Sequence, residues 1–174
     1  AVKVRVYPNA AQESLLLKTF GCKRWCWNHW LAEREDYFRQ HGNTTRFTYT
    51  SARELKKSHL WLKEPDSIAL QQARRDLDTA YGRFFSKLGR HPRFKPKHGK
   101  QSYRTQQTND NIQIDFATRK LKLPKVGWLA YRDGRVFDEK IKNVTVSRTK
   151  SGRYFASILI SKETNVQEKS TIHE

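Results

Sequence analysis

The spacing of apolar residues predicts one strand, then helices, then several strands. Residues 2–7 alternate apolar and polar side chains, which is the period of a half-buried strand. Asn9 and Gln12 have the form of a helix-capping box, so a helix is expected from there to about residue 40. Two adjacent apolar stripes recur along it, which predicts a central helix contacted on two sides. The stripes are Leu16, Phe20, Trp27, Leu31 and Phe38, and Leu15, Cys22, Cys26, Trp30 and Tyr37.

The remaining pattern predicts two more helices and a block of strands. Ser51 with Glu54 opens a helix expected to end near residue 58, and residues 65–67 open another that Gly89 is expected to end. From Ile112 onward the period changes to two, with strands expected at 112–116, 121–123, 126–131, 144–146 and 154–160. A first strand separated from the others by helices predicts an α+β fold, a β-barrel that carries a helical insertion.

Charge narrows the class of partner. The 174 residues include 35 Lys and Arg against 17 Asp and Glu, a formal net charge of +18. A surplus of this size favours nucleic acid, because basic side chains gain by releasing phosphate counterions. No apolar run approaches the roughly 20 residues of a membrane span, so no membrane partner is expected. The absence of Met and the polar run at 163–174 indicate a piece of a longer protein.

One segment concentrates the positive charge. No acidic residue occurs from Thr79 to Asn109, and prolines and glycines keep the middle of this run from being helical. Basic side chains interleaved with aromatic ones supply phosphate contacts and stacking surfaces. The alternative interpretation is a solvated, flexible loop. The residues predicted to bind the nucleic-acid backbone are Arg83, Lys87, Arg90, Arg93, Lys95, Lys97, Lys100, Tyr103 and Arg104.

Other constellations do not add up to catalytic chemistry. Cys22 and Cys26, with His29 nearby, have helical spacing, but a zinc site needs further ligands, so core packing is favoured. Asp66, Asp76 and Asp78 fall on one predicted helix, whereas a two-metal nuclease needs carboxylates that converge from separate elements. The sequence therefore predicts no catalytic residue, no metal site and no cofactor in this chain.

Eight short segments, in order along nearly the whole chain, resemble the TnpB (OrfB) family of transposon-encoded RNA-guided DNA nucleases. They are VRVYPNAAQ (4–12), FGCKRWCWN (20–28), ALQQA (69–73), AYGRFF (80–85), PRFK (92–95), SYRTQ (102–106), LKLPKVGW (121–128) and NVTV (143–146). The family's next element would be a RuvC-type nuclease domain, where its divalent metal is expected, and the sequence stops before that element.

This resemblance implies a division of the chain. Residues 1–8 and 105–163 would form a split wedge domain, an oligonucleotide-binding-like β-barrel. Residues 9–104 would form the inserted helical recognition domain, with a basic loop at 89–104, and residues 164–174 would be a linker to the nuclease domain. The implied partners are a guide RNA derived from the transposon end and target duplex DNA with a flanking motif. The implied location is the cytoplasm of a bacterium or archaeon, where the protein would be associated with the nucleoid.

Three functions follow from this resemblance. The first is the nucleic-acid-binding portion of a nuclease, without catalysis of its own, in which guide pairing selects the target and the protein reads the flanking motif. The second is a stand-alone DNA-binding regulator derived from a nuclease-dead relative. The third is a full nuclease whose catalytic domain lies beyond this sequence.

The resemblance also implies which residues read the motif. Gln can pair with adenine through two hydrogen bonds, and an apolar side chain such as Ile68 suits a thymine methyl group. The residues carried over as motif readers are Tyr49, Arg53, Ser67, Ile68, Gln71, Thr108 and Asn109.

Overall fold

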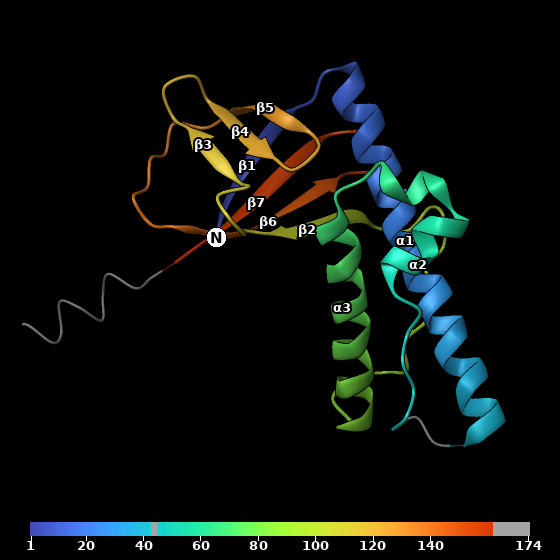
Figure 1. Cartoon of the computed structure of the whole chain (residues 1–174). Helices are drawn as coiled ribbons and strands as arrows, with labels where there is room; N and C mark the ends of the chain where they lie inside the picture. Colours follow the sequence, from blue (N-terminus) through green and yellow to red (C-terminus); the bar gives the residue numbers. More distant parts are fainter. Residues whose placement is uncertain (43–44, 162–174) are drawn as a thin grey trace, which may run out of the picture.

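The computed structural model describes residues 1–42 and 45–161, in which helices lie to one side of an antiparallel sheet (Figure 1). The helices are α1 (Ala10–His41), α2 (Ala52–Ser58) and α3 (Ser67–Phe85), with a 3-10 helix η1 (Leu60–Lys63). The strands are β1 (Val2–Tyr7), β2 (Gln101–Gln106), β3 (Gln113–Asp115), β4 (Lys120–Leu123), β5 (Gly127–Arg132), β6 (Ile141–Arg148) and β7 (Tyr154–Ile160). The α+β class is confirmed.

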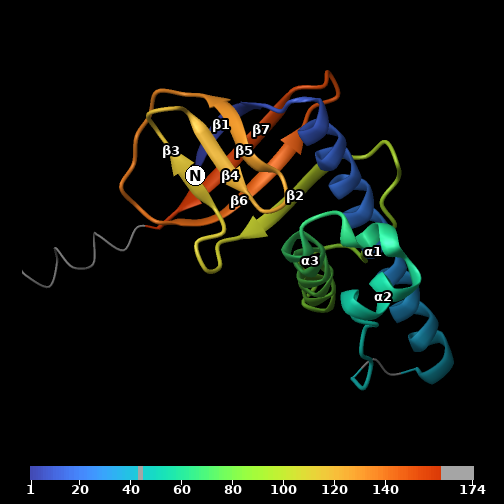
Figure 2. The ribbon, with the colours of Figure 1, turned by 45° about the horizontal axis from the view of Figure 1, so that its top comes forward.

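The sheet is a single seven-stranded one in the order β2-β6-β7-β1-β5-β4-β3, and every pairing is antiparallel. It curls around one core (Figure 2). The outermost strands, β2 and β3, are not paired with each other within the described residues, so the sheet is not closed and the expected barrel is not confirmed. β1 lies in the middle of the sheet, between β7 and β5, because its alternating valines pack inward there.

Helix α1 is the element that joins the two layers. Its start is the predicted capping box, with the Asn9 and Gln12 side chains each bonded to the other's backbone. Gln12 Nε2 also donates to the carbonyl of Trp128 at 2.8 Å, which ties this end to β5. Gly42, with a φ of 64°, ends the helix in the left-handed conformation that glycine adopts without strain.

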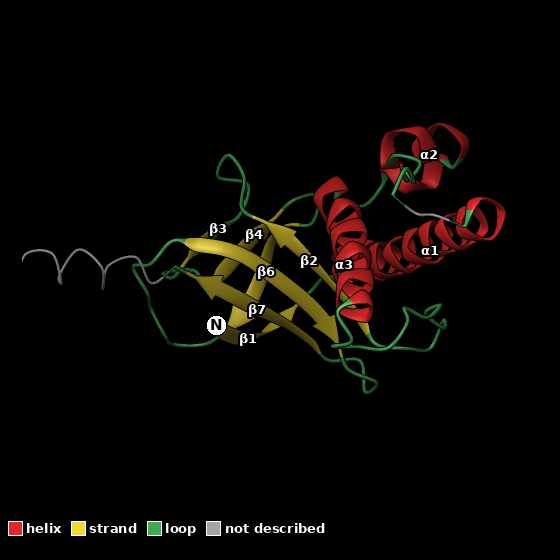
Figure 3. Cartoon of the chain, turned by 90° about the horizontal axis from the view of Figure 1, so that it is seen from below, coloured by secondary structure: helices red, strands yellow, loops and turns green. Residues whose placement is uncertain are grey.

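The partners of α1 change along the helix. Both apolar stripes contact one core in the first half of the helix and a different core further along. Leu16 and Phe20 belong to the core of the sheet. Cys26, Trp30 and their neighbours from Cys22 onward belong to a second core, formed with α2, η1 and α3. The helix therefore begins against the sheet and continues into the helical layer, which Figure 3 shows beside the sheet.

A row of polar side chains, which we call the α3–β2 seam, fastens the helical layer to the sheet edge. Asp66 caps α3 and accepts a hydrogen bond from buried Thr105. Gln106 donates to Gln72 at 3.0 Å, and Arg104 donates to Asp76 at 3.0 Å. The seam comprises Asp66, Gln72, Asp76, Arg104, Thr105 and Gln106. Because β2 holds α3 in this way, the segment that links them is fixed at both ends.

The structure corrects two element boundaries. Residues 101–104, which the sequence assigned to the basic loop, begin strand β2 and pair with β6. Helix α3 ends at Phe85 rather than at Gly89, and Leu88 beyond it is 68% exposed. Residues 162–163 of the expected wedge and the expected linker at 164–174 lie outside the described residues. Within the described part, no helix is long and apolar enough to cross a membrane.

Candidate nucleic-acid interface

The segment between α3 and β2, residues 86–100, is a strap laid along α1, which we call the basic strap. Trp27 Nε1 donates to the carbonyl of Arg93 at 2.9 Å. Asn28 bonds both the backbone N–H and the carbonyl of Lys95, at 2.8 and 3.0 Å. Arg24 reaches the carbonyl of Lys97 at 3.2 Å. These bonds hold the backbone of the strap, which argues against the flexible loop of the alternative interpretation.

The side chains of the strap point mostly to solvent. Arg90 and Arg93 are exposed, and so are Lys87, Lys97 and Lys100. None of them forms an ion pair with a carboxylate of the described residues. Lys95 differs, because it is half-buried with its ammonium 4.1 Å from the centre of the Trp27 ring. A fixed backbone with unpaired cations is an arrangement suited to phosphate groups.

Two residues predicted to contact the nucleic-acid backbone have other positions. Tyr103 is wrong as a contact: it is 1% exposed and packs in the core of the sheet beside Phe20, because it lies on the inward face of β2. Arg104 lies on the outward face but is paired with Asp76 in the α3–β2 seam. Arg83, at the end of α3, is exposed and donates to the carbonyl of Leu88 at 3.2 Å.

The motif-reading residues carried over from the resemblance fall mainly around the start of α3. Ser67 and Ile68 lie in its first turn, where Asp66 caps the helix and bonds Thr105. Gln71 is exposed one turn later. The turn at 108–109, which contains Thr108 and Asn109, follows β2, whose last residue bonds the residue beside Gln71. The seam thus brings these two segments, far apart in the sequence, to one place. The remaining predicted motif reader on a helix, Arg53, is exposed on α2.

Tyr49 lies further along α3, against its third turn. Its hydroxyl accepts a hydrogen bond from Arg34 at 2.8 Å, and its ring packs edge-on against Phe47. Burial raises the pKa of Tyr49 to about 12. It lines a shallow pocket together with Arg74 and Asp78 of α3. Since Gln71 and Arg74 are three residues apart on the helix, they share this side of α3. Arg74 was missed by the sequence analysis.

A second basic surface was also missed: the outward side of the sheet. We call it the outer sheet face and define it by Lys3, Arg5, Tyr7, Lys122, Trp128, Arg132 and Phe155. The seven strands together contain eight Lys or Arg and only one acidic residue, Asp115. Tyr7 and Trp128 are 41% and 43% exposed. Cations alternate with exposed aromatic rings on this face, as on surfaces that bind single strands.

Its centre is a pair of like charges. Arg5 and Arg132 are direct register partners, and both guanidinium groups lie over Tyr7, at 5.0 and 5.7 Å from the ring centre. The Nε of Arg5 is buried and has no hydrogen-bond partner in the part of the chain that the structure describes. Like charges opposite each other destabilise a sheet unless an anion neutralises them. The alternation of Lys3 and Arg5 with valines was visible in the sequence. The sequence did not show that β5, which carries Arg132, would be the strand paired with β1.

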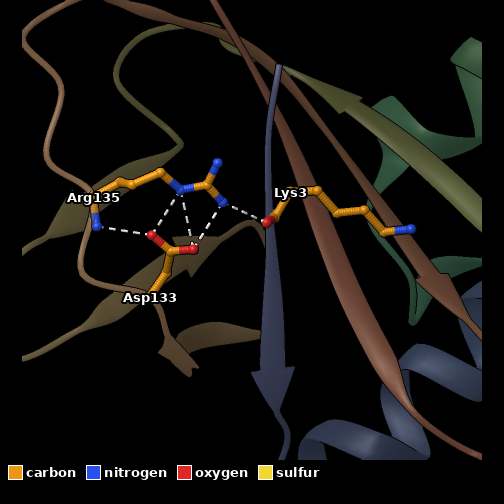
Figure 4. A network of polar contacts seen from close by, with 3 residues as sticks. All are labelled: Lys3, Asp133 and Arg135. Atoms are coloured by element: carbon orange, nitrogen blue, oxygen red, sulfur yellow. Dashed lines mark hydrogen bonds and ion pairs between the residues drawn. The ribbon is translucent and has the colours of Figure 1, made fainter.

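A carboxylate that follows β5 beside this face is already paired. Asp133 binds Arg135 through both carboxylate oxygens, at 2.8–3.2 Å, and Arg135 Nη2 donates to the carbonyl of Lys3 at 2.9 Å (Figure 4). The Lys3 side chain points away from this network, with its ammonium 4.8 Å from the Phe155 ring centre. The Arg135 side-chain hydrogen bonds lower the pKa of Asp133 to about 2, so its carboxylate stays ionised at neutral pH.

The cysteines have the packing role that the sequence favoured. Cys22 and Cys26 are 6% and 0% exposed in the helical core. Burial raises the pKa of Cys26 to about 12. In the described part of the chain, no three His, Cys, Asp or Glu side chains come together as metal ligands would.

Comparison with known proteins places this arrangement in a family. The family model HTH_OrfB_IS605, described as a helix-turn-helix domain, matches residues 1–49. Two relatives bear the name "Putative RNA-guided DNA endonuclease": InsQ of Escherichia coli (strain K12), 31% identical over 172 residues, and a Streptomyces pristinaespiralis protein, 33% identical over 168. These alignments cover 94% and 91% of this chain and 40% of each relative.

A third relative is shorter. The virulence protein VsdF of Salmonella dublin is 35% identical over 117 residues, which cover 58% of this chain and 95% of VsdF. The chain belongs to the TnpB (OrfB) family. The family resemblance expected from the eight segments is thereby confirmed, and the chain spans 40% of the length of the two endonuclease-named relatives.

The name of the matching family model does not describe the local structure of this TnpB-family chain. Within residues 1–42 and 45–49 the structure has one strand and one uninterrupted helix of 32 residues. The match therefore supports membership of the family without describing the fold of this segment.

Proposed function

We propose that this chain is the nucleic-acid-binding portion of a transposon-associated RNA-guided DNA endonuclease. The observation that carries the proposal is the basic strap, whose exposed cations have no carboxylate partner among the described residues and whose backbone is fixed on α1. The outer sheet face adds a second surface of the same kind. We assign the chain no catalytic role: in the proposal, a nuclease domain supplies both the metal and the cleavage.

These two surfaces and the start of α3 suggest separate roles. The strap and the outer sheet face would hold the scaffold of the guide RNA, the sheet acting as the wedge domain with its oligonucleotide-binding-like curl. The group around the start of α3, with Gln71 exposed, would read the DNA motif beside the target. The names of InsQ and of the Streptomyces relative support this role, because they concern RNA-guided DNA endonucleases.

A stand-alone DNA-binding regulator is the second candidate. It is favoured by VsdF, a relative matched over 95% of its own length by a part of this chain. RNA that copurifies with the protein, and whose removal abolishes recognition of duplex DNA, would support the guided function. Sequence-specific DNA binding by RNA-free protein would support the regulator.

The strap is tested by the dependence of RNA affinity on salt. Changing Lys87, Arg90 and Arg93 together to Ala removes three phosphate contacts, so the slope of log K against log salt should flatten by about 2 to 3 units. The control changes Lys18, Arg39 and Lys57 to Ala. It lowers the charge equally but removes cations that are paired with Glu64, Asp36 and Glu54.

The control should change the slope by less than about one unit, because exposed cations already paired with carboxylates release few phosphate counterions. Binding of a structured RNA is measured by fluorescence anisotropy at several salt concentrations. Equal slopes for the two triple variants would show that the strap is not a phosphate surface.

A further inference from the structure

A pocket lies where the end of the basic strap passes between α1 and the start of β2. Its volume is about 230 Å³, several times the roughly 30 Å³ that one water molecule occupies in the liquid. Of its ten lining residues, five are cationic and none is acidic. The cations are Lys23 and Arg24 from α1 and Lys95, Lys97 and Lys100 from the strap.

Lys23 is partly buried, whereas Lys97 and Lys100 are exposed. Its ammonium donates to the carbonyl of Ser102 at 3.0 Å and pairs with no carboxylate of the described residues. Burial lowers the pKa of Lys23 to about 8. The charged groups that act on it are Lys95 and Lys100 of the strap and Arg104 of β2, which lower the pKa further, and Asp76 of α3, which raises it. Burial also lowers the pKa of Lys95.

The pocket is built before any ligand arrives. Asn28 fixes the backbone of Lys95 from both sides, and Arg24 fixes the carbonyl of Lys97. Gly99 closes the turn so tightly that an added Cβ would lie 3.3 Å from the carbonyl oxygen of Pro96. These restraints keep the cations close together although they repel one another, and such a preorganised site favours the ligand that removes the repulsion.

The positive lining continues beyond the pocket. A more open cavity next to it shares Lys97 and Lys100 and extends to Arg148 and Lys150 at the β6–β7 turn. Within residues 1–42 and 45–161, the buried Nε of Arg148 has no hydrogen-bond partner. A chain of phosphate groups could therefore lead out of the pocket along a path without carboxylates in its lining.

We propose that this pocket binds one phosphate group of the nucleic-acid backbone, with Lys23 as its deepest contact. The proposal rests on the proposed function and specifies where the strap holds its ligand most tightly. A bound phosphate restores the opposite charge that Lys23 lacks, so binding takes up a proton whenever the free amine is neutral. Affinity should consequently fall as pH rises above about 8, by up to tenfold per pH unit.

The test measures the binding of a structured RNA from pH 6.5 to 9.5 at constant ionic strength. Lys23→Met retains most of the apolar stem, and it should weaken binding at pH 7 by about tenfold or more and lose most of the fall above pH 8. The control is Lys18→Met, which removes an equal charge from the exposed side of α1 and should keep the fall. Parallel titrations with duplex DNA and with inorganic phosphate show which source of phosphate the pocket prefers.

A second measurement holds even if Lys23→Met does not fold. Lysines of the parent chain are methylated reductively with ¹³C, and the pKa of Lys23 is followed by NMR with and without RNA. The proposal requires this pKa to rise on binding. A parent that binds no RNA at low salt would refute the proposed function itself. A parent that binds RNA while the Lys23 pKa stays unchanged would overturn only the pocket.

Discussion

The α3–β2 seam and the basic strap adjoin each other, yet they treat charge in opposite ways. In the seam, Asp76 accepts hydrogen bonds from Arg104 and Gln72. Asp66 accepts hydrogen bonds from the Thr105 hydroxyl and from the backbone N–H of Ile68 in the first turn of α3. In the strap, the exposed Lys and Arg side chains have no carboxylate partner among the described residues. The backbone, His91 and the half-buried Lys95 are what contact the helices. Polar groups in the seam stabilise the fold, whereas those of the strap remain available for a ligand.

The difference teaches how a chain with a net charge of +18 can fold. Buried polar groups need partners, because an unsatisfied one destabilises the folded state by about 1–3 kcal/mol. Exposed cations need none, since water solvates them. Some acidic residues accordingly lie where helices meet each other or the sheet. Glu35 of α1, for example, accepts a hydrogen bond from Tyr81 of α3 and also pairs with His91.

The largest predicted effect, which tests whether the seam stabilises the fold, is the loss of stability on changing Asp66. Asp66→Ala removes the cap of α3 and leaves the hydroxyl of Thr105, a fully buried residue, without its partner. The free energy of unfolding should fall by about 2–4 kcal/mol, measured by urea denaturation. Asp36→Ala, which removes only an exposed ion pair with Arg39, should change it by less than about 0.5 kcal/mol. Similar losses for both would mean that the seam is no more important than the surface.

Two neighbouring glutamines sharpen the comparison. Gln72 is 6% exposed and bonded within the seam, whereas Gln71 is exposed. Gln72→Ala should lower the free energy of unfolding by about 1–3 kcal/mol, because Gln106 and Asp76 lose their partner.

Gln71→Ala should leave stability within about 0.5 kcal/mol. It should instead lose about 1–3 kcal/mol of discrimination at one base of the flanking DNA motif, measured by competition between motif variants. An equal loss of affinity for motif and scrambled DNA would reassign Gln71 to contact with the DNA backbone.

The smallest effect concerns pH. Burial raises the pKa of Asp66 above 3.8, against hydrogen bonds from Thr105 and Ile68 that lower it. The folded chain therefore holds this proton more tightly than the unfolded chain, so the contribution of Asp66 to stability falls as pH rises from about 4 through its folded pKa. Asn has no such proton. The free energy of unfolding of the parent, relative to Asp66→Asn, should decrease over that window. A constant difference would show that Asp66 is not perturbed.

Much of the local structure was predictable from the sequence. The capping box of α1, the start of α3 at Asp66 and the strands at β1 and β7 follow from side-chain patterns within a few residues. The excess of basic residues at 79–109 also pointed to nucleic acid, because charge is a property of composition. Strand β2 escaped prediction because its inward positions are Tyr103 and Thr105, between polar residues, rather than an apolar alternation.

Only the tertiary structure decided which charges are free. The sequence places Arg104 and Arg93 in the same basic run, but strand pairing turns Arg104 toward Asp76, whereas Arg93 is held by its carbonyl and keeps its guanidinium in solvent. The outer sheet face likewise depends on Arg5 and Arg132 meeting across strands separated by more than a hundred residues. Periodicity is local, whereas the pairing of charges depends on which distant segments meet, here β1 with β5 and α3 with β2.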